Sequence, residues 1–180
     1  MKYLFTLSLF ALFSIQLSAQ KPAAYQLSVG DKFEVASSME QSLSQQVMGQ
    51  NMEAIQSTST IDMYEVISVD NGIYRIKTTG VQRKFEINSQ MMSMTMDSES
   101  DDEQSMPFRL MVDRSYEFTM NDKGEIQNIY GNEEVKKEIS EELAGTMYAQ
   151  TANEISSAFD TEALKASLSG QFNIYADDNE

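Results

Sequence analysis

The sequence predicts an α+β fold, built on a predominantly antiparallel, curved β-sheet with two C-terminal helices. The strands are expected to form a hairpin meander that resembles a half-barrel. Two turn sequences, Asn71-Gly72 and residues 121–124 (Asn-Asp-Lys-Gly), are flanked by alternating apolar residues, which is the pattern of β-hairpins. After Gly131 the apolar residues recur every four positions instead, which is typical of helices.

The first strand is expected to begin near a turn at Gly30. Between residues 35 and 47 every fourth residue is apolar, a spacing that fits one face of a strand and also a helical stripe. We favour a strand, because residues 48–51 (Met-Gly-Gln-Asn) have the composition of a turn and residues 52–60 resume the alternation of polar and apolar residues.

The hairpin around Asn71-Gly72 is the local structure that the sequence specifies best, since Asn and Gly tolerate the positive φ angles of a type I′ turn. A two-residue loop predicts that Val69 faces Tyr74, that Ile67 faces Ile76 and that Glu65 faces Thr78. The apolar face of this hairpin would then contain Met63, Ile67, Val69, Tyr74 and Ile76. Glu65 would lie among these apolar residues, where burial would raise its pKa, unless it reaches water near a rim.

Gly80 is expected to interrupt the third strand, which resumes over residues 81–87. Met92, Met94 and Met96 then alternate with Ser and Thr, as in a further strand. Residues 97–103 form an acidic loop that cannot bury itself, and Pro107 ends it. We expect this loop to be solvated, because it lacks the glycine and the closing glutamate of a calcium loop.

The second hairpin is expected to place Met120 opposite Ile126 and Tyr116 opposite Tyr130, with Gly124 in the left-handed conformation. Helices are expected near residues 133–149, with Asn132 as N-cap, and near residues 152–169, with Gly170 just beyond the end. Residues 172–175 are expected to open another strand.

Residues 1–20 have the layout of a secretory signal peptide: a basic residue, an apolar run and a small-residue end. Cleavage after Ala19 or Gln20 would make Gln20 or Lys21 the first residue of the exported chain. We expect residues 21–180 to form a single β-rich domain. An N-terminal membrane anchor is the alternative that we disfavour. The exported chain should therefore be secreted or periplasmic, and its sequence contains no second apolar run that could span a membrane.

The composition excludes several functions. With 28 acidic and 13 basic residues the formal net charge is −15, which disfavours nucleic acid and anionic lipid as partners. The chain has no Cys and no His, so thiol chemistry, the usual zinc ligands and the commonest general base are absent. We therefore expect no cofactor and no enzymatic activity.

Several short motifs are shared with one protein family. They are Tyr25-x-Leu27, Gly30-Asp31-Lys32-Phe33, residues 45–50, Tyr64-Glu65-Val66, Asp97-Ser98 and residues 121–126. Together they resemble an uncharacterised family of secreted, often Met-rich bacterial cell-envelope β proteins, over residues 25–175. The resemblance implies no known activity and no catalytic residues. Its members commonly continue into further strands, so it implies that this chain is the front portion of a longer domain.

The candidate ligand-binding residues are those expected on the apolar face of the sheet. They are Glu65, Met63, Tyr74, Met92, Met94 and Met96. Thioethers bind Cu(I), but alternating Met also makes a flexible apolar surface, and we favour the second interpretation. The sequence thus predicts an exported, non-enzymatic binding or structural protein whose Met-lined concave sheet holds a hydrophobic small molecule or a segment of an envelope protein. The alternatives are a Cu(I)-binding protein and a carboxylate-dependent hydrolase.

Overall fold

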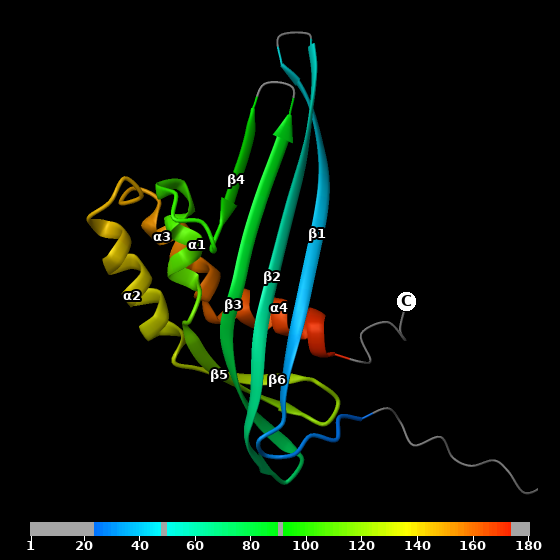
Figure 1. Cartoon of the computed structure of the whole chain (residues 1–180). Helices are drawn as coiled ribbons and strands as arrows, with labels where there is room; N and C mark the ends of the chain where they lie inside the picture. Colours follow the sequence, from blue (N-terminus) through cyan, green and yellow to red (C-terminus); the bar gives the residue numbers. More distant parts are fainter. Residues whose placement is uncertain (1–23, 48–49, 90–91, 174–180) are drawn as a thin grey trace, which may run out of the picture.

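The computed structural model describes residues 24–47, 50–89 and 92–173 (Figure 1). The strands are β1 (Lys32–Val47), β2 (Gln50–Asp70), β3 (Ile73–Ser89), β4 (Ser93–Asp97), β5 (Ser115–Asn121) and β6 (Ile126–Tyr130). The helices are η1 (Glu103–Ser105), α1 (Met106–Met111), α2 (Asn132–Ala144), α3 (Ala152–Ser156), η2 (Ser157–Phe159) and α4 (Thr161–Phe172). The expected signal peptide, the tip of the first hairpin at residues 48–49, and Ile174 and Tyr175 lie outside the described residues.

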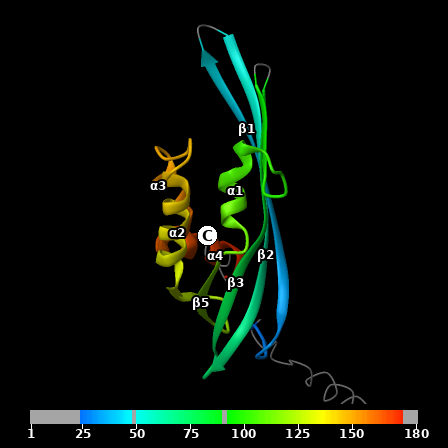
Figure 2. The same ribbon diagram turned by 60° about the vertical axis from the view of Figure 1, so that its left-hand side comes forward.

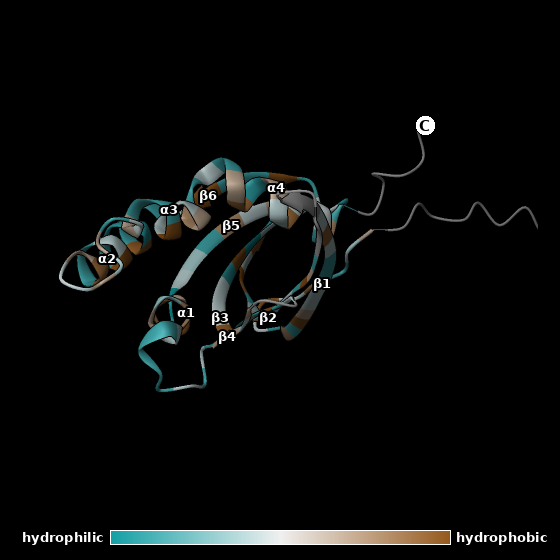
Figure 3. Ribbon diagram, turned by 90° about the horizontal axis from the view of Figure 1, so that it is seen from above, coloured by the Kyte–Doolittle hydropathy of each residue, from teal (hydrophilic) through white to brown (hydrophobic). Residues whose placement is uncertain are grey.

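All strands belong to one antiparallel sheet with the order β1-β2-β3-β5-β6, and β4 pairs with β3 beside this path. One edge of β3 serves two partners, because Ile73–Thr79 pair with β5 and Lys84–Asn88 pair with β4. Among the described residues no pairing joins β1 to β6, so the sheet stays open, and it curves around α4, while α2 and α3 lie beyond β5 (Figures 1 and 3). The predicted α+β class and the curved antiparallel sheet are confirmed.

β1 and β3 follow the sequence predictions in part. Residues 35–47 do form a strand rather than a helix. Gly80 does not end the third strand, which runs unbroken from Ile73 to Ser89, but a register shift next to Asp62 leaves one extra residue, Val81, in β3.

The predicted register of the first hairpin is right only beside its turn. Asn71 and Gly72 have φ angles of 49° and 79°, and Val69 faces Tyr74 as expected. A β-bulge between Val66 and Ser68 then leaves Ile67 without an opposite residue, so that Val66, not Ile67, faces Ile76. An extra residue in one strand reverses the side on which all later side chains lie.

The bulge therefore exchanges the two faces of β2 below the turn. Tyr64 and Val66 are each 1% exposed and lie in the core, together with Tyr74 and Ile76. The prediction that Met63 and Glu65 lie on the apolar face is wrong, because both belong to the opposite set of alternating residues.

The second hairpin contains a similar irregularity. Met120 faces Ile126, and Gly124 has a φ of 83°, both as predicted. A register shift between Thr119 and Met120 places Glu117, rather than Tyr116, opposite Tyr130.

The helices are more divided than the sequence suggested. Gly131, with a φ of 78°, is the N-cap of α2, while Asn132 is the first helical residue and donates a side-chain hydrogen bond to the Phe159 carbonyl at 2.9 Å. α2 ends at Ala144 rather than near residue 149. The second predicted helix is three pieces, α3, η2 and α4, and the short helix α1 was not predicted.

The C-terminal end of α4 is the largest departure from the predicted secondary structure. Gly170 lies inside this helix, which continues to Phe172, so Phe172 is the last residue of a helix rather than the first of a strand. Phe172 is 4% exposed and its ring contacts four others.

The main core lies between α4 and the lower part of the concave face, on strands β1, β2, β3 and β5 (Figures 1 and 3). Its buried members are Tyr64, Val66, Tyr74, Ile76, Phe118, Met120, Leu168 and Phe172. A second cluster joins α2 to α3 and η2, with α1 and β5 residues at its margin, and contains Val135, Ile139, Leu143, Ala152 and Phe159. The upper parts of β1 to β4 extend beyond both clusters (Figure 2).

In the part of the chain that the structure describes, no helix has the length and apolar character needed to cross a membrane.

Candidate functional site

The upper concave face of the sheet is built from rows of side chains that the strand pairing aligns. Residues that pair across neighbouring strands lie on the same face of the sheet. The residues paired with Phe85 and with Ile87 therefore form two rows that cross β1, β2, β3 and β4. The contact between the rings of Phe85 and Phe108 of α1, 6.5 Å apart, shows that these rows lie on the helix side of the sheet. One row is Met39, Thr58, Phe85 and Met96, and the next is Gln41, Gln56, Ile87 and Met94.

Much of this face remains accessible. Met39 is 58% exposed and Leu43 is 38% exposed, while Phe85, Ile87, Met94 and Met96 are half-buried. β2 contributes shorter or polar side chains between them, at Ala54, Gln56 and Thr58. The upper concave face, defined by these residues, thus has two apolar flanks on β1 and on β3–β4, separated by the side chains of β2.

A buried ion pair marks the lower end of the upper concave face. The Arg83 guanidinium contacts the Asp62 carboxylate, and their side chains are only 17% and 12% exposed. Arg83 also donates from Nη1 to the carbonyls of Ile61 at 3.0 Å and Gln82 at 2.8 Å. The carboxylate and the two carbonyls thus provide acceptors for the Arg83 guanidinium, as a buried charge requires. The ion pair lies where the sheet passes from the part covered by α4 to the uncovered upper strands.

Two tyrosines flank this ion pair. Burial, and after it the negative charge of Asp62, raises the pKa of both Tyr64 and Tyr116 above the ordinary value of 10.0. The Tyr64 hydroxyl stays protonated and donates to Gln171 Oε1 on α4 at 2.8 Å. The ion pair and the Tyr64 hydroxyl therefore both have partners within the fold.

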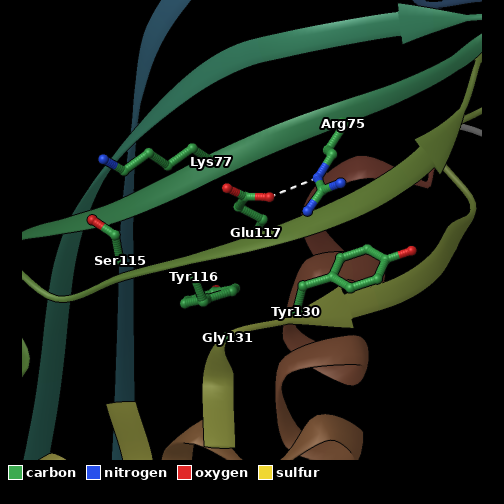
Figure 4. A pocket seen from close by; sticks show the side chains of 7 residues that line it. All are labelled: Arg75, Lys77, Ser115, Tyr116, Glu117, Tyr130 and Gly131. Carbon is green, nitrogen blue, oxygen red and sulfur yellow. Dashed lines mark hydrogen bonds and ion pairs between the residues drawn. The ribbon is translucent and has the colours of Figure 1, made fainter. Parts of the chain in front are cut away.

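A separate pocket of about 250 Å³ opens between β3, β5, β6 and the start of α2 (Figure 4). Arg75 Nε donates to Glu117 Oε2 at 2.6 Å, and the guanidinium lies 4.7 Å from the centre of the Tyr130 ring. The pocket is also lined by Lys77, Ser115, Tyr116 and Gly131. The charges of Arg75 and Glu117 neutralise each other, and Lys77 adds one positive charge to the lining.

The structure separates the residues that the sequence suggested for a ligand site. Met94 and Met96 do lie on the upper concave face, opposite Ile87 and Phe85. Met92 precedes β4 and is 51% exposed. Tyr74 is 6% exposed within the lower core, where its hydroxyl donates to the Tyr25 carbonyl at 2.7 Å.

Glu65 and Met63 lie on the convex face because of the bulge at Ile67. Glu65 Oε2 is 3.2 Å from Lys32 Nζ, and both side chains are more than a third exposed. Such an exposed pair contributes little to stability and marks no site.

The sequence analysis did not identify Asp62 and Arg83. It also did not identify the residues of other strands that lie beside Met94 and Met96 of β4. The signal for Asp62 was its position two residues before Tyr64, which places both on one face of a strand. Nothing in the sequence indicated Arg83 as its partner, because the register shift next to Asp62 decides which residue of β3 it meets.

A metal site of the usual ligand types is not found in the part of the chain described here, where no three His, Cys, Asp or Glu residues are grouped to hold an ion. Thioether ligands are a different case. Neighbouring strands lie about 4.8 Å apart. Met39 and Met96 are separated by two intervening strands, so they are too distant from each other to bind one ion.

Comparison with known proteins identifies a family but no function. Residues 71–179 match a family of unknown function, DUF6263, and since the match covers more than half of the chain, the chain belongs to this family. The matched segment starts at the turn before β3 and includes β3 to β6 and all the helices. No curated protein and no solved structure matches the chain.

Proposed function

We propose that this DUF6263 member is an exported, non-enzymatic binding protein of the cell envelope that holds an elongated apolar ligand on its upper concave face. The accessible apolar side chains of that face carry the proposal. Soluble proteins rarely leave apolar side chains of several strands uncovered together, unless they bind a ligand or a partner there.

The chemistry of the face favours an apolar ligand of variable shape. Met39, Met94 and Met96 are unbranched and polarisable, so they can adapt to different apolar groups. Polar side chains of β2 lie between the flanks, and the rows repeat along the strands. A narrow, elongated group such as an alkyl chain can therefore contact both apolar flanks along the strand direction.

Binding of an apolar fluorescent probe tests this proposal. The probe N-phenyl-1-naphthylamine should bind saturably and be displaced by dodecanoate. The double variant Met39→Gln, Leu43→Gln should weaken probe affinity about tenfold, because apolar contact area is lost at two positions. Ile55→Gln is the matched control, since Ile55 is 50% exposed in β2 but lies on the convex face, and it should change affinity less than about twofold. Equal losses in both variants, or no saturable binding, would contradict the proposal.

Replacing Met92, Met94 and Met96 together by Leu separates apolar binding from Cu(I) binding. Leu keeps the apolar surface and nearly the same volume, so the probe should still bind and the free energy of unfolding should change by less than about 1.5 kcal/mol per site. A thioether site for Cu(I) would instead lose its ligands. Competition for Cu(I) against a chromophoric chelator measures the second outcome. Strong Cu(I) binding by the unmodified chain that disappears in the Leu variant would favour the metal over the apolar ligand.

A further inference from the structure

β1 (Lys32–Val47) is a long edge strand with an unpaired side. Among the described residues it pairs with β2 alone, over its whole length of 16 residues and without any register shift. Protein edges are commonly protected by proline, bulges, short length or many charges. β1 contains no Pro and no Gly, is regular throughout, and carries only Lys32, Glu34 and Glu40 as charged residues.

The hydrogen bonds at the start of β1 determine which residues face its free side. Val66 of β2 donates to the Asp31 carbonyl at 2.9 Å and accepts from Gly30 N–H at 2.8 Å, so both backbone groups of Val66 point towards β1. Given the two-residue period of an antiparallel ladder, Phe33 and each second residue after it bond to β2. The even-numbered residues of β1 therefore direct their N–H and C=O groups to the free side.

We propose that two copies of this chain associate through this edge, with their β1 strands antiparallel about a twofold axis at Ala36. In this register the even-numbered residues meet even-numbered residues of the second copy, so that the free N–H and C=O groups of both edges form one ladder. Lys32 lies opposite Glu40 of the second copy, and Glu34 lies opposite Ser38. The two sheets become one continuous sheet.

Charge and apolar complementarity favour this register over its neighbours. A shift of the axis to Ser37 would place Glu34 opposite Glu40, and a shift to Ser38 would place Lys32 opposite Ser44. An axis at Glu34 would place that carboxylate against itself. On the concave face, the axis at Ala36 brings Met39, which is 58% exposed, opposite Phe33 of the second copy. Lys32, 59% exposed beside Glu65, remains free enough to contact a second carboxylate.

Sedimentation equilibrium of the exported chain tests the proposal. The unmodified protein should be dimeric in the micromolar range. Ala36→Pro removes the central N–H from the free edge without removing any bond to β2, so it should leave a folded monomer with an unchanged circular dichroism spectrum. Ser42→Pro makes the same kind of change at another edge-facing position, beyond the paired segment from Lys32 to Glu40, and should remain dimeric.

A charge exchange identifies the register. Glu40→Lys should weaken dimerisation about tenfold, because like charges then lie opposite each other at two symmetric positions. Adding Lys32→Glu should restore most of the lost affinity, the remaining difference reflecting the ion pair with Glu65 that this change breaks. The proposal is overturned if the unmodified chain is a monomer at every concentration, if Ala36→Pro remains dimeric, or if the double exchange fails to restore association.

Discussion

Replacing Phe172 by Ala is expected to lower the free energy of unfolding by about 3 to 5 kcal/mol, as for other large-to-small changes of a buried aromatic residue. Phe172 is 4% exposed at the end of α4. The centre of its ring lies 5.2 Å from that of Tyr64 and 5.6 Å from that of Phe118, and it also contacts Tyr25 and Phe33. The variant would thus leave a cavity at the point where α4 meets three strands and the N-terminal segment.

The surroundings of Phe172 cannot collapse easily into this cavity. Gly124, in the turn between β5 and β6, has a φ of 83°, and a Cβ built on it would lie only 1.8 Å from the Phe172 carbonyl oxygen. The end of the helix is therefore fixed against the backbone of this turn. Urea unfolding followed by circular dichroism measures the loss.

Tyr130→Ala is the matched control for the Phe172 variant. Tyr130 is 41% exposed and its ring contacts the Arg75 guanidinium, so its removal should cost less than about 1 kcal/mol. If both variants lose the same stability, the end of α4 does not pack on the sheet as described.

The strands could be predicted from the sequence, but their faces could not. Asn71-Gly72 fixes its own turn because the backbone angles are a local property. From Ile61 to Val69 six of the nine residues are apolar or aromatic, and they occupy both sets of alternating positions, one through Ile67 and one through Tyr64 and Val66. The bulge at Ile67 decides between them, and it depends on packing against α4 and β5, which lie far away in the sequence.

Phe172 illustrates the same limit for helices. The residues after Gly170 have strand-like composition, and glycine commonly follows the last turn of a helix. Burial of Phe172 among four aromatic rings extends the helix beyond this local signal. Long-range packing thus overrides local preference at the end of α4, as it commonly does.

The candidate site was predictable only as a set of residue types. The alternation of methionines correctly indicated a strand at Met94 and Met96, whereas Met92 lies just before β4. Its neighbours Phe85 and Ile87, and the more distant Met39, follow from pairings that the sequence does not specify. The prediction that Glu65 and Met63 share this face failed with the register.

Replacing Arg83 by Leu is expected to destabilise the protein by about 3 to 5 kcal/mol, because it leaves the carboxylate of Asp62 buried without its cation. Asp62 lies on the same face as Tyr64, and its side chain is only 12% exposed, so little water can take the place of the guanidinium. The carbonyls of Ile61 and Gln82 would also lose a donor. Arg75→Leu provides the control, since the Arg75–Glu117 pair is 45% and 32% exposed and should contribute less than about 1 kcal/mol.

The double variant Asp62→Leu, Arg83→Leu separates the cost of an unpaired charge from the value of the pair. Replacing a buried ion pair by apolar side chains is often neutral, because the cost of removing both charges from water disappears. We therefore expect the double variant to recover at least half of the stability that Arg83→Leu loses, measured by urea unfolding at neutral pH. If instead the double variant loses as much stability as Asp62→Leu and Arg83→Leu lose together, Asp62 and Arg83 act independently. The contact between them would then not hold the lower end of the upper concave face together.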